Sequence, residues 1–361
     1  MIVVRALVGL AGAVIVLLTL GSALLTVVVP RARMTRLTWF HFVWIRRVFV
    51  ALASPRRPFA VRDRILAVYA PFALAALPGA WLTVVIVAFS FVFWGCGIDP
   101  YREALAVSGS SLTTLGFERP DGLVLEVISV IEAAIGLGLV ALMISYLPTI
   151  YTAFQRREAR VGGLQVRAGL PPEPTKLYRR YVRIGWLDRL GDELFPEWED
   201  WFIDIEESHT SQAALVFFRS PHPDRSWITA AGCVLDAAAL HNAVIDLPHD
   251  PRADILLRSG FLCLRRIASS FEMRHDDDPR PDDPISISRE EFDEVCAELA
   301  EAAVPLVADL DQGWRDFAGW RVNYDVVLGR LAELVVAPEA RWSTDRHVPR
   351  SHLPLLRPRR A

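Results

Sequence analysis

Cysteine is scarce in this chain of 361 residues, and its placement excludes two common ways of stabilising a small domain. None of the cysteines forms a CxxC pair or stands at zinc-ligand spacing with a histidine; they are Cys96, Cys233, Cys263 and Cys296. A disulfide framework or a structural metal site is therefore not expected.

Motifs of catalysis are missing as well. The eight histidines include no HExxH pair and no nucleophile-elbow context. No GxGxxG opens a βαβ unit, and Gly162-Gly163 does not follow a strand pattern. The sequence therefore predicts neither an enzyme nor a bound cofactor.

Apolar residues, in contrast, are abundant. They make up 52% of the chain, and the mean hydropathy is +0.29, so membrane segments are sought first. The charge is divided unevenly. Residues 1–170 hold 16 arginines against eight acids, a net charge of +8, whereas the remainder carries a net charge of −11. Because the arginines cluster beside apolar segments and the other half is acidic, no nucleic-acid partner is expected.

The first apolar segment, Ala6–Val29, is long enough to cross a bilayer. A cleaved signal peptide is the alternative, but the apolar core exceeds the usual length and only Arg5 precedes it. Residues 31–64 then contain nine arginines and one acid, Asp63. By the positive-inside rule this stretch is cytoplasmic and the N-terminus lies outside. A cleaved peptide would leave the arginines outside, so we reject that alternative.

Two further spans are expected, Ile65–Trp94 and Leu123–Phe154, the second followed by another arginine-rich flank. Both flanks predict the same topology: three spans across the cell membrane, with the C-terminus on the cytoplasmic side. Thr38–Ala53 is too short and too charged to span, and its mixture of aromatics and arginines is typical of a helix lying at the lipid interface. Membrane lipid is thus the first expected partner.

The remainder of the chain is predicted to be a helical cytoplasmic domain. Helical spacing marks Ile228–Val244 and Arg289–Ala303, the latter opened by a capping box from Ser288 to Glu291. Asp276–Pro284 could bind calcium, but it lacks EF-hand spacing and its prolines favour a solvated loop. The tail from Ala337 is expected to be partly disordered. The predicted boundaries are 1–30 first span, 31–64 arginine-rich segment, 65–155 pore domain, 156–175 linker and 176–361 cytoplasmic domain.

The stretch between the second and third spans, Tyr101–Glu118, is too polar to span. It begins as a helix and ends in Thr113-Thr114-Leu115-Gly116-Phe117, followed by a turn. A half-length helix that ends in a Thr/Gly segment is typical of a re-entrant pore loop. The segment resembles the selectivity filter of potassium channels, Thr-Val-Gly-Tyr-Gly, with Glu118 in place of the last glycine.

This resemblance covers roughly residues 65–155 and implies an all-α membrane protein: three transmembrane helices, one re-entrant pore loop and a helical cytoplasmic domain. It implies a homotetramer in which backbone carbonyls of residues 114–117 bind potassium ions, with Thr113 behind them. Glu118 and Asp121 would form an acidic outer mouth. Glu132 is an acid within the third span that could brace the pore helix through Ser108 or Ser110. The hinge of the inner helix would lie at Gly136, Gly138 and Pro148.

Three hypotheses about function remain at this point. The first is a potassium-preferring channel. Whether the cytoplasmic domain gates it, and which cytoplasmic regulator would act on that domain, are left open by the sequence. The second is a weakly selective cation pore, because the side chain of Glu118 disfavours the backbone conformation that glycine adopts at the end of the filter. The third is a non-conducting membrane anchor for a helical interaction domain.

Overall fold

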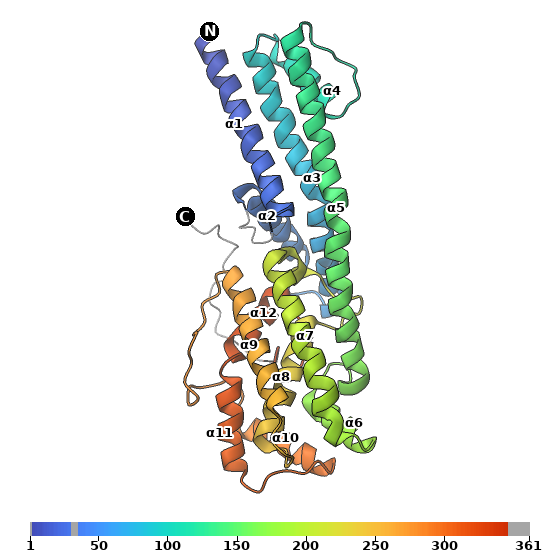
Figure 1. Ribbon diagram of the computed structural model, residues 1–361, viewed down its shortest axis with the longest axis vertical. Helices are drawn as coiled ribbons and strands as arrows, with labels where there is room; N and C mark the ends of the chain where they lie inside the picture. Colours follow the sequence, from blue (N-terminus) through green and yellow to red (C-terminus); the bar gives the residue numbers. More distant parts are fainter. Residues whose placement is uncertain (1, 30–34, 346–361) are drawn as a thin grey trace. The chain divides into compact units, whose positions relative to one another are not determined.

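The computed structural model describes residues 2–29 and 35–345, which are mainly helical (Figure 1). An isolated bridge between Ile245 and Leu306 is the one β pairing within these ranges. The all-α expectation is therefore confirmed. The helices are α1 (Ile2–Val27), α2 (Arg36–Leu52), α3 (Phe59–Gly95), α4 (Tyr101–Leu112), α5 (Leu123–Ala168), α6 (Pro174–Arg183), η1 (Leu187–Arg189), α7 (Leu190–Ser211), η2 (Ala213–Phe217), α8 (Trp227–Val244), α9 (Pro251–Ser270), α10 (Arg289–Glu301), α11 (Leu310–Arg321) and α12 (Asp325–Val335).

The helices belong to two compact units. The first unit contains residues up to 50 and residues 68–151, and the second contains residues 51–67 and the described residues from 152 onward. Helices α3 and α5 have residues in both units and are continuous as secondary structure.

Within the described part of the chain, four helices are long and apolar enough to cross a membrane: α1, α3, α5 and α8. The first three coincide with the predicted spans. In α8, however, 94% of the apolar window is buried inside the second unit, where the helix contacts α9 and α11. The apolar side chains of α8 are thus covered by protein. We therefore assign α8 to the core of the second unit; the sequence predicts a helix over residues 228–244 but not its burial on all sides.

Within the first unit, α1 and α3 approach each other through small residues. A Cβ atom on Gly12 would lie 2.4 Å from the carbonyl oxygen of Ala88, and one on Gly95 would lie 2.8 Å from the Cα of Gly9. The two backbones therefore touch at positions where only glycine fits. Such close approach through small residues is how membrane helices pack without a hydrophobic driving force.

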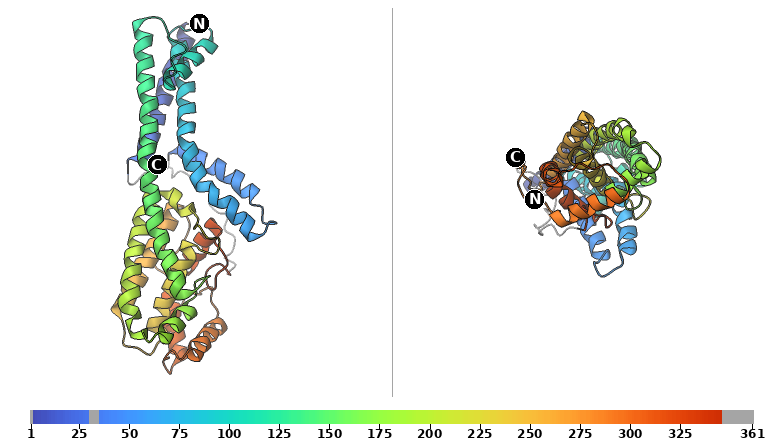
Figure 2. Two further views of the ribbon diagram at one scale, coloured as in Figure 1. Left: turned by 90° about the vertical axis from the view of Figure 1, so that its right-hand side faces the viewer. Right: turned by 90° about the horizontal axis from the view of Figure 1, so that it is seen from below.

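Helix α2 lies against α1 and beside the first unit's part of α3 (Figure 2). Thr38 Oγ1 lies 3.2 Å from Ser22 Oγ and 3.0 Å from Thr26 Oγ1, which joins α2 to α1. The Tyr69 hydroxyl donates to the carbonyl oxygen of Phe42 at 3.2 Å, which joins it to α3. The opposite face exposes a stripe with a spacing of four residues: Phe40, Trp44 and Val48.

The second unit is a helical bundle whose interior contains charged groups as well as apolar side chains. The Arg321 guanidinium donates to Asp236 at 2.5 Å and to Asp325 at 2.8 Å, and all three residues are buried. The predicted capping box of α10 is present, since Ser288 accepts from the N–H of Glu291 and Glu291 accepts from the N–H of Ser288. The charges of Arg321, Asp236 and Asp325 are thus paired within the bundle.

Helix α5 differs from prediction at its C-terminal end. The sequence predicts a linker over residues 156–175, but α5 continues to Ala168 and passes through Gly162 and Gly163. Each glycine in a helix costs about 1 kcal/mol relative to alanine. Burial of Val161 and Leu164 on the same stretch offsets that cost. The non-helical connection therefore shrinks to residues 169–173.

Two further expectations concern Pro148 and the C-terminal tail. Pro148, predicted as part of a hinge, lies inside the continuous helix α5. Proline lacks the N–H that would bond to the carbonyl one turn earlier, and in membrane helices neighbouring helices or Ser/Thr side chains can re-satisfy such a carbonyl. The tail is ordered as far as residue 345, since Trp342 is 1% exposed and its carbonyl accepts from Arg321. The rest of the predicted disordered tail lies outside the described residues.

Candidate pore loop

Helix α4 is twelve residues long and ends at the position predicted from the sequence. Thr113 is its C-cap, and Thr114 follows with a left-handed backbone, φ +58°. The N–H of Thr114 donates to the carbonyl of Ser111 at 3.0 Å, and the N–H of Leu115 donates to that of Ser110 at 3.1 Å. These two bonds form a Schellman motif, the usual ending of a helix whose next residue is left-handed.

The loop after α4 has a second left-handed residue, Gly116, with φ +69°. Left-handed residues thus occur at Thr114 and Gly116, whereas Leu115 and Phe117 do not have positive φ. Because left-handed residues alternate with residues of negative φ, the peptide groups of this loop do not follow the regular orientation of a helix or a strand. Leu115 and Phe117 are 72% and 62% exposed on the single chain, so the first unit leaves most of each residue uncovered.

The far end of the loop is held by one side chain of α4. The Ser110 hydroxyl donates to the carbonyl oxygen of Glu118 at 2.9 Å and accepts from the N–H of Glu118 at 2.9 Å. Glu118 does not have a positive φ. Both backbone groups of Glu118 are therefore fixed by a residue near the end of α4, and the loop is closed over residues 111–117.

Glu132 connects this region to α5. It is 0% exposed, and its Oε1 atom lies 2.5 Å from the Ser108 Oγ of α4. Ser108 Oγ also lies 2.9 Å from the carbonyl oxygen of Ile86 in α3. Of the two serines predicted as partners of Glu132, Ser108 makes the contact, and Ser110 instead holds Glu118. Three helices thus meet at one hydroxyl group.

The three positions predicted as a hinge have different surroundings. A Cβ on Gly136 would lie 2.6 Å from the carbonyl oxygen of Leu112, so this glycine permits α4 and α5 to touch. Gly138 has no atom within 4 Å of the corresponding position. Pro148 is enclosed by regular helix on both sides. Gly136 is therefore a packing contact, and Gly138 retains the open surroundings that a hinge requires.

The acidic residues predicted for the outer mouth, Glu118 and Asp121, are both exposed. The sequence places Arg119 between them, which would weaken an acidic ring. In the structure, however, the Arg119 guanidinium pairs with Glu126 in the first turn of α5 at 3.1 Å. The arginine is thus directed toward α5.

One buried group in the second unit was missed by sequence reasoning. Arg157 is 0% exposed, and its guanidinium donates to the carbonyls of Leu215 and Phe218 at 2.9 and 2.7 Å. It also donates to Glu158 and lies 3.1 Å from His209 Nε2. The sequence shows Arg157 only as one of several arginines after the third span. No signal separates it from Arg156, which is exposed.

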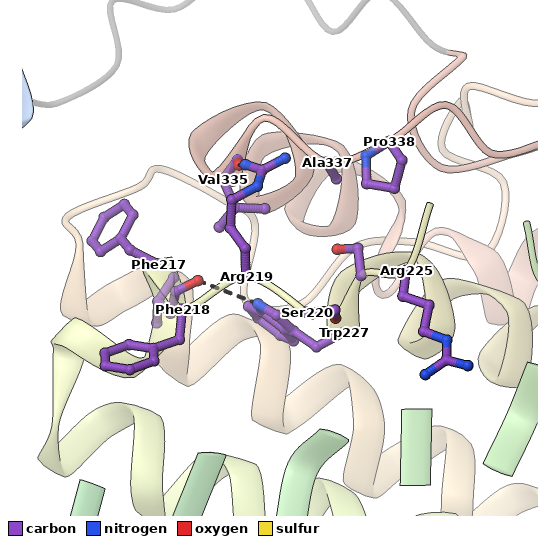
Figure 3. A pocket seen from close by; sticks show the side chains of 11 residues that line it. Phe217, Phe218, Arg219, Ser220, Arg225, Trp227, Val335, Ala337 and Pro338 are labelled. Atoms are coloured by element: carbon purple, nitrogen blue, oxygen red, sulfur yellow. Dashed lines mark hydrogen bonds between the residues drawn. The ribbon is translucent and has the colours of Figure 1, made fainter. Parts of the chain in front are cut away.

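A partly buried arginine, Arg219, donates to the carboxylate of Asp63 and to the carbonyl oxygens of Val335 and Val336. It lines a cavity of about 20 Å³ together with Ser220 and Trp227 (Figure 3). The buried hydroxyl of Ser220 has no partner in the described part of the chain. A space of this volume holds about one water molecule, so it is not a site for a larger ligand.

Neither a metal site nor a similar protein helps to assign a function to this site. No group of three or more His, Cys, Asp or Glu side chains within the described ranges could hold a metal ion. Comparisons with protein-family models, with curated proteins and with solved structures found no match.

Proposed function

We propose that this chain is one subunit of a homotetrameric, potassium-preferring cation channel of the cell membrane. The observation that carries the proposal is the arrangement of α4 and its loop between α3 and α5. A helix of twelve residues is too short to span, and its loop has exposed, irregular backbone. Such backbone is tolerated at membrane depth only where protein buries it or it lines a water-filled path.

The residues of the loop fit an ion path formed by backbone carbonyls. In the proposed filter, Thr114, Leu115, Gly116 and Phe117 present carbonyl oxygens that replace the hydration shell of potassium. One chain supplies one loop, and a filter of this type takes four. Fourfold assembly would also cover the exposed side chains of Leu115 and Phe117.

The proposed topology follows from the arginines that flank the apolar helices. Residues 31–64 and 156–160 are rich in arginine, and the positive-inside rule puts both segments in the cytoplasm. The N-terminus and the pore loop are then outside. Helix α2 would lie at the inner interface with Phe40, Trp44 and Val48 toward lipid, as an amphipathic interfacial helix does.

The second unit would be the cytoplasmic domain that acts on the pore. Residues 59–67 of α3 and 152–168 of α5 belong to this unit, and Arg219 and Arg157 tie them to its bundle. A change in the bundle would therefore be transmitted directly into the two helices that flank the pore loop. A regulator that binds the bundle could open or close the pore in this way.

A weakly selective cation pore is the second candidate, and Glu118 is the observation that favours it. The residue has no positive φ, and its backbone is fixed by Ser110. Its carbonyl bonds to Ser110 and is thereby occupied, so the outermost ion site would be altered. Reversal potentials in mixed potassium and sodium distinguish the two candidates: a large shift toward the potassium potential supports the first, and a value near zero supports the second.

Ion flux in liposomes tests the channel itself. We expect purified protein to pass potassium and Gly116→Ala to remove most of the flux, because alanine disfavours the left-handed backbone of the filter. Gly122→Ala is the matched control, since Gly122 also has a positive φ, +100°, but lies outside the filter. Absence of flux in the wild type, or equal flux in both variants, would refute the proposal.

The mass of the detergent-solubilised particle provides an independent test. A channel with this filter requires four chains, whereas a membrane anchor for an interaction domain does not. A protein–detergent particle whose protein mass corresponds to four copies supports the channel. A monomer without flux would establish the anchor instead.

A further inference from the structure

Glu132 lies at the junction of three helices and has no positively charged partner. None of the ion pairs formed by the described residues includes it, and its side chain is 0% exposed. Oε1 contacts Ser108 Oγ, and Oε2 is buried with no hydrogen-bond partner. An ionised carboxylate in these surroundings would keep a full charge with one oxygen entirely unsolvated, which proteins rarely tolerate.

The hydrogen bonds at the junction can be counted. Ser108 Oγ carries one hydrogen and lies within bonding distance of two acceptors, Oε1 of Glu132 at 2.5 Å and the carbonyl of Ile86 at 2.9 Å. The Ile86 carbonyl can only accept. If Glu132 were ionised it could also only accept, and the single hydrogen would have to serve both contacts.

A protonated Glu132 removes this shortage. The carboxylic acid then donates its hydrogen to Ser108 Oγ, and Ser108 donates its own hydrogen to the Ile86 carbonyl. Each short contact has one hydrogen, and Oε2 becomes a neutral oxygen whose burial without a partner is far less costly than that of a charged one.

We propose that Glu132 is held as a neutral carboxylic acid, and that its proton is part of the chain of hydrogen bonds joining α5 to α4 and α3. Ser108 precedes Ser110 by two residues, and Ser110 fixes Glu118 at the end of the loop. Glu132 is therefore a positioning residue for the pore loop. This last role rests on the proposed function; the protonation state does not.

Infrared difference spectroscopy of the purified full-length protein at neutral pH tests the protonation state. The wild-type minus Glu132→Gln spectrum should contain the C=O stretching band of a carboxylic acid, shifted in D₂O. Glu126→Gln is the control, because Glu126 is half-exposed and pairs with Arg119, so its spectrum should show carboxylate bands. A carboxylate band in place of the acid band for Glu132 would overturn the proposal.

A second variant keeps the test decisive if Glu132→Gln does not fold. Ser108→Ala removes the acceptor of the proposed proton, so the acid band should move to higher frequency in wild-type minus variant spectra. An acid band that Ser108→Ala leaves unmoved would show that the proton is not on this contact.

The positioning role has a separate readout in flux. Glutamine keeps an N–H donor for Ser108, so Glu132→Gln should retain most of the wild-type flux, whereas Glu132→Ala should lose it. Equal loss in both variants would reject the positioning role. If wild-type protein shows the acid band but no flux, the proposed channel function fails and the neutral acid stands.

Discussion

The Cα of Gly136 lies directly against the last turn of α4, so that a Cβ there would be 2.6 Å from the Leu112 carbonyl and 3.0 Å from Leu112 Cδ1. Backbone atoms cannot move aside as the end of a flexible side chain can. The last turn of α4 and the turn of α5 around Gly136 can therefore approach this closely only because Gly136 has no Cβ. This contact, together with the hydrogen bond between Ser108 and Glu132, sets the position from which the loop begins.

Replacing Gly136 by a larger residue should lower the stability of the protein. Gly136→Ala forces α4 away from α5, and overpacking of this kind costs about 1–3 kcal/mol. Gly138→Ala is the control, because its Cβ would meet no atom within 4 Å and alanine favours a helix by up to about 1 kcal/mol. Thermal unfolding of the solubilised protein should show a lower midpoint for the first variant and an equal or higher one for the second. The reverse order would contradict the packing argument.

The sequence predicts the framework well where one physical signal dominates. Long apolar runs predict α1, α3 and α5, because a helix is the form in which such a run satisfies its backbone in lipid. The polar half-helix before Thr113 is also predictable, since its composition changes abruptly at both ends. The partner of Glu132 could be narrowed to two serines because both lie on α4, but only the helix orientation decides between them.

Other features could not be predicted, because they depend on what packs against a segment. Gly162-Gly163 has the composition of a linker, yet burial of the surrounding turn keeps α5 helical. Arg156 and Arg157 are adjacent and identical in type, and only the direction of each side chain makes one exposed and the other fully buried. The sequence predicts the direction of a side chain only where polar and apolar residues alternate with a regular period over several turns, and two adjacent arginines form no such pattern.

Thr114 provides a prediction about the cap of α4. A β-branched residue at φ +58° is strained by roughly 1–2 kcal/mol relative to its right-handed form. Thr114→Gly should therefore raise the free energy of unfolding by about 1 kcal/mol, as glycine is preferred at this position of a Schellman motif. Thr113→Gly is the matched control, since Thr113 has φ −79° and gains no relief. Chemical denaturation measures both, and stabilisation by the second variant alone would argue against the cap.

Arg157 and Arg156 form a natural pair for testing the buried anchor. Arg157→Leu leaves two backbone carbonyls and Glu158 without their donor, and breaking a buried ionic contact costs about 3–5 kcal/mol. Arg156→Ala removes an exposed pair with Asp204, worth about 0–1 kcal/mol. Unfolding midpoints should differ strongly between the variants. Similar midpoints would show that the guanidinium of Arg157 is dispensable for the fold.

The neighbour of Arg157 gives a prediction about pH. His209 is 0% exposed, and burial, followed by the positive charge of Arg157, holds the pKa of its imidazole well below the ordinary value of about 6.5. Its Nε2 atom accepts from Arg157 and so carries no proton.

Since the unfolded chain binds this proton more readily than the folded chain, stability is complete above about pH 6.5 and falls as the pH decreases below it. The slope from this one group is about 1.4 kcal/mol per pH unit. His209→Gln keeps an acceptor for Arg157 but cannot take up a proton, so its unfolding free energy should decline less steeply between about pH 6.5 and 5. Urea denaturation of both proteins across this range provides the comparison. Parallel curves would mean that His209 is not neutral in the folded protein, or that it does not gain a proton on unfolding.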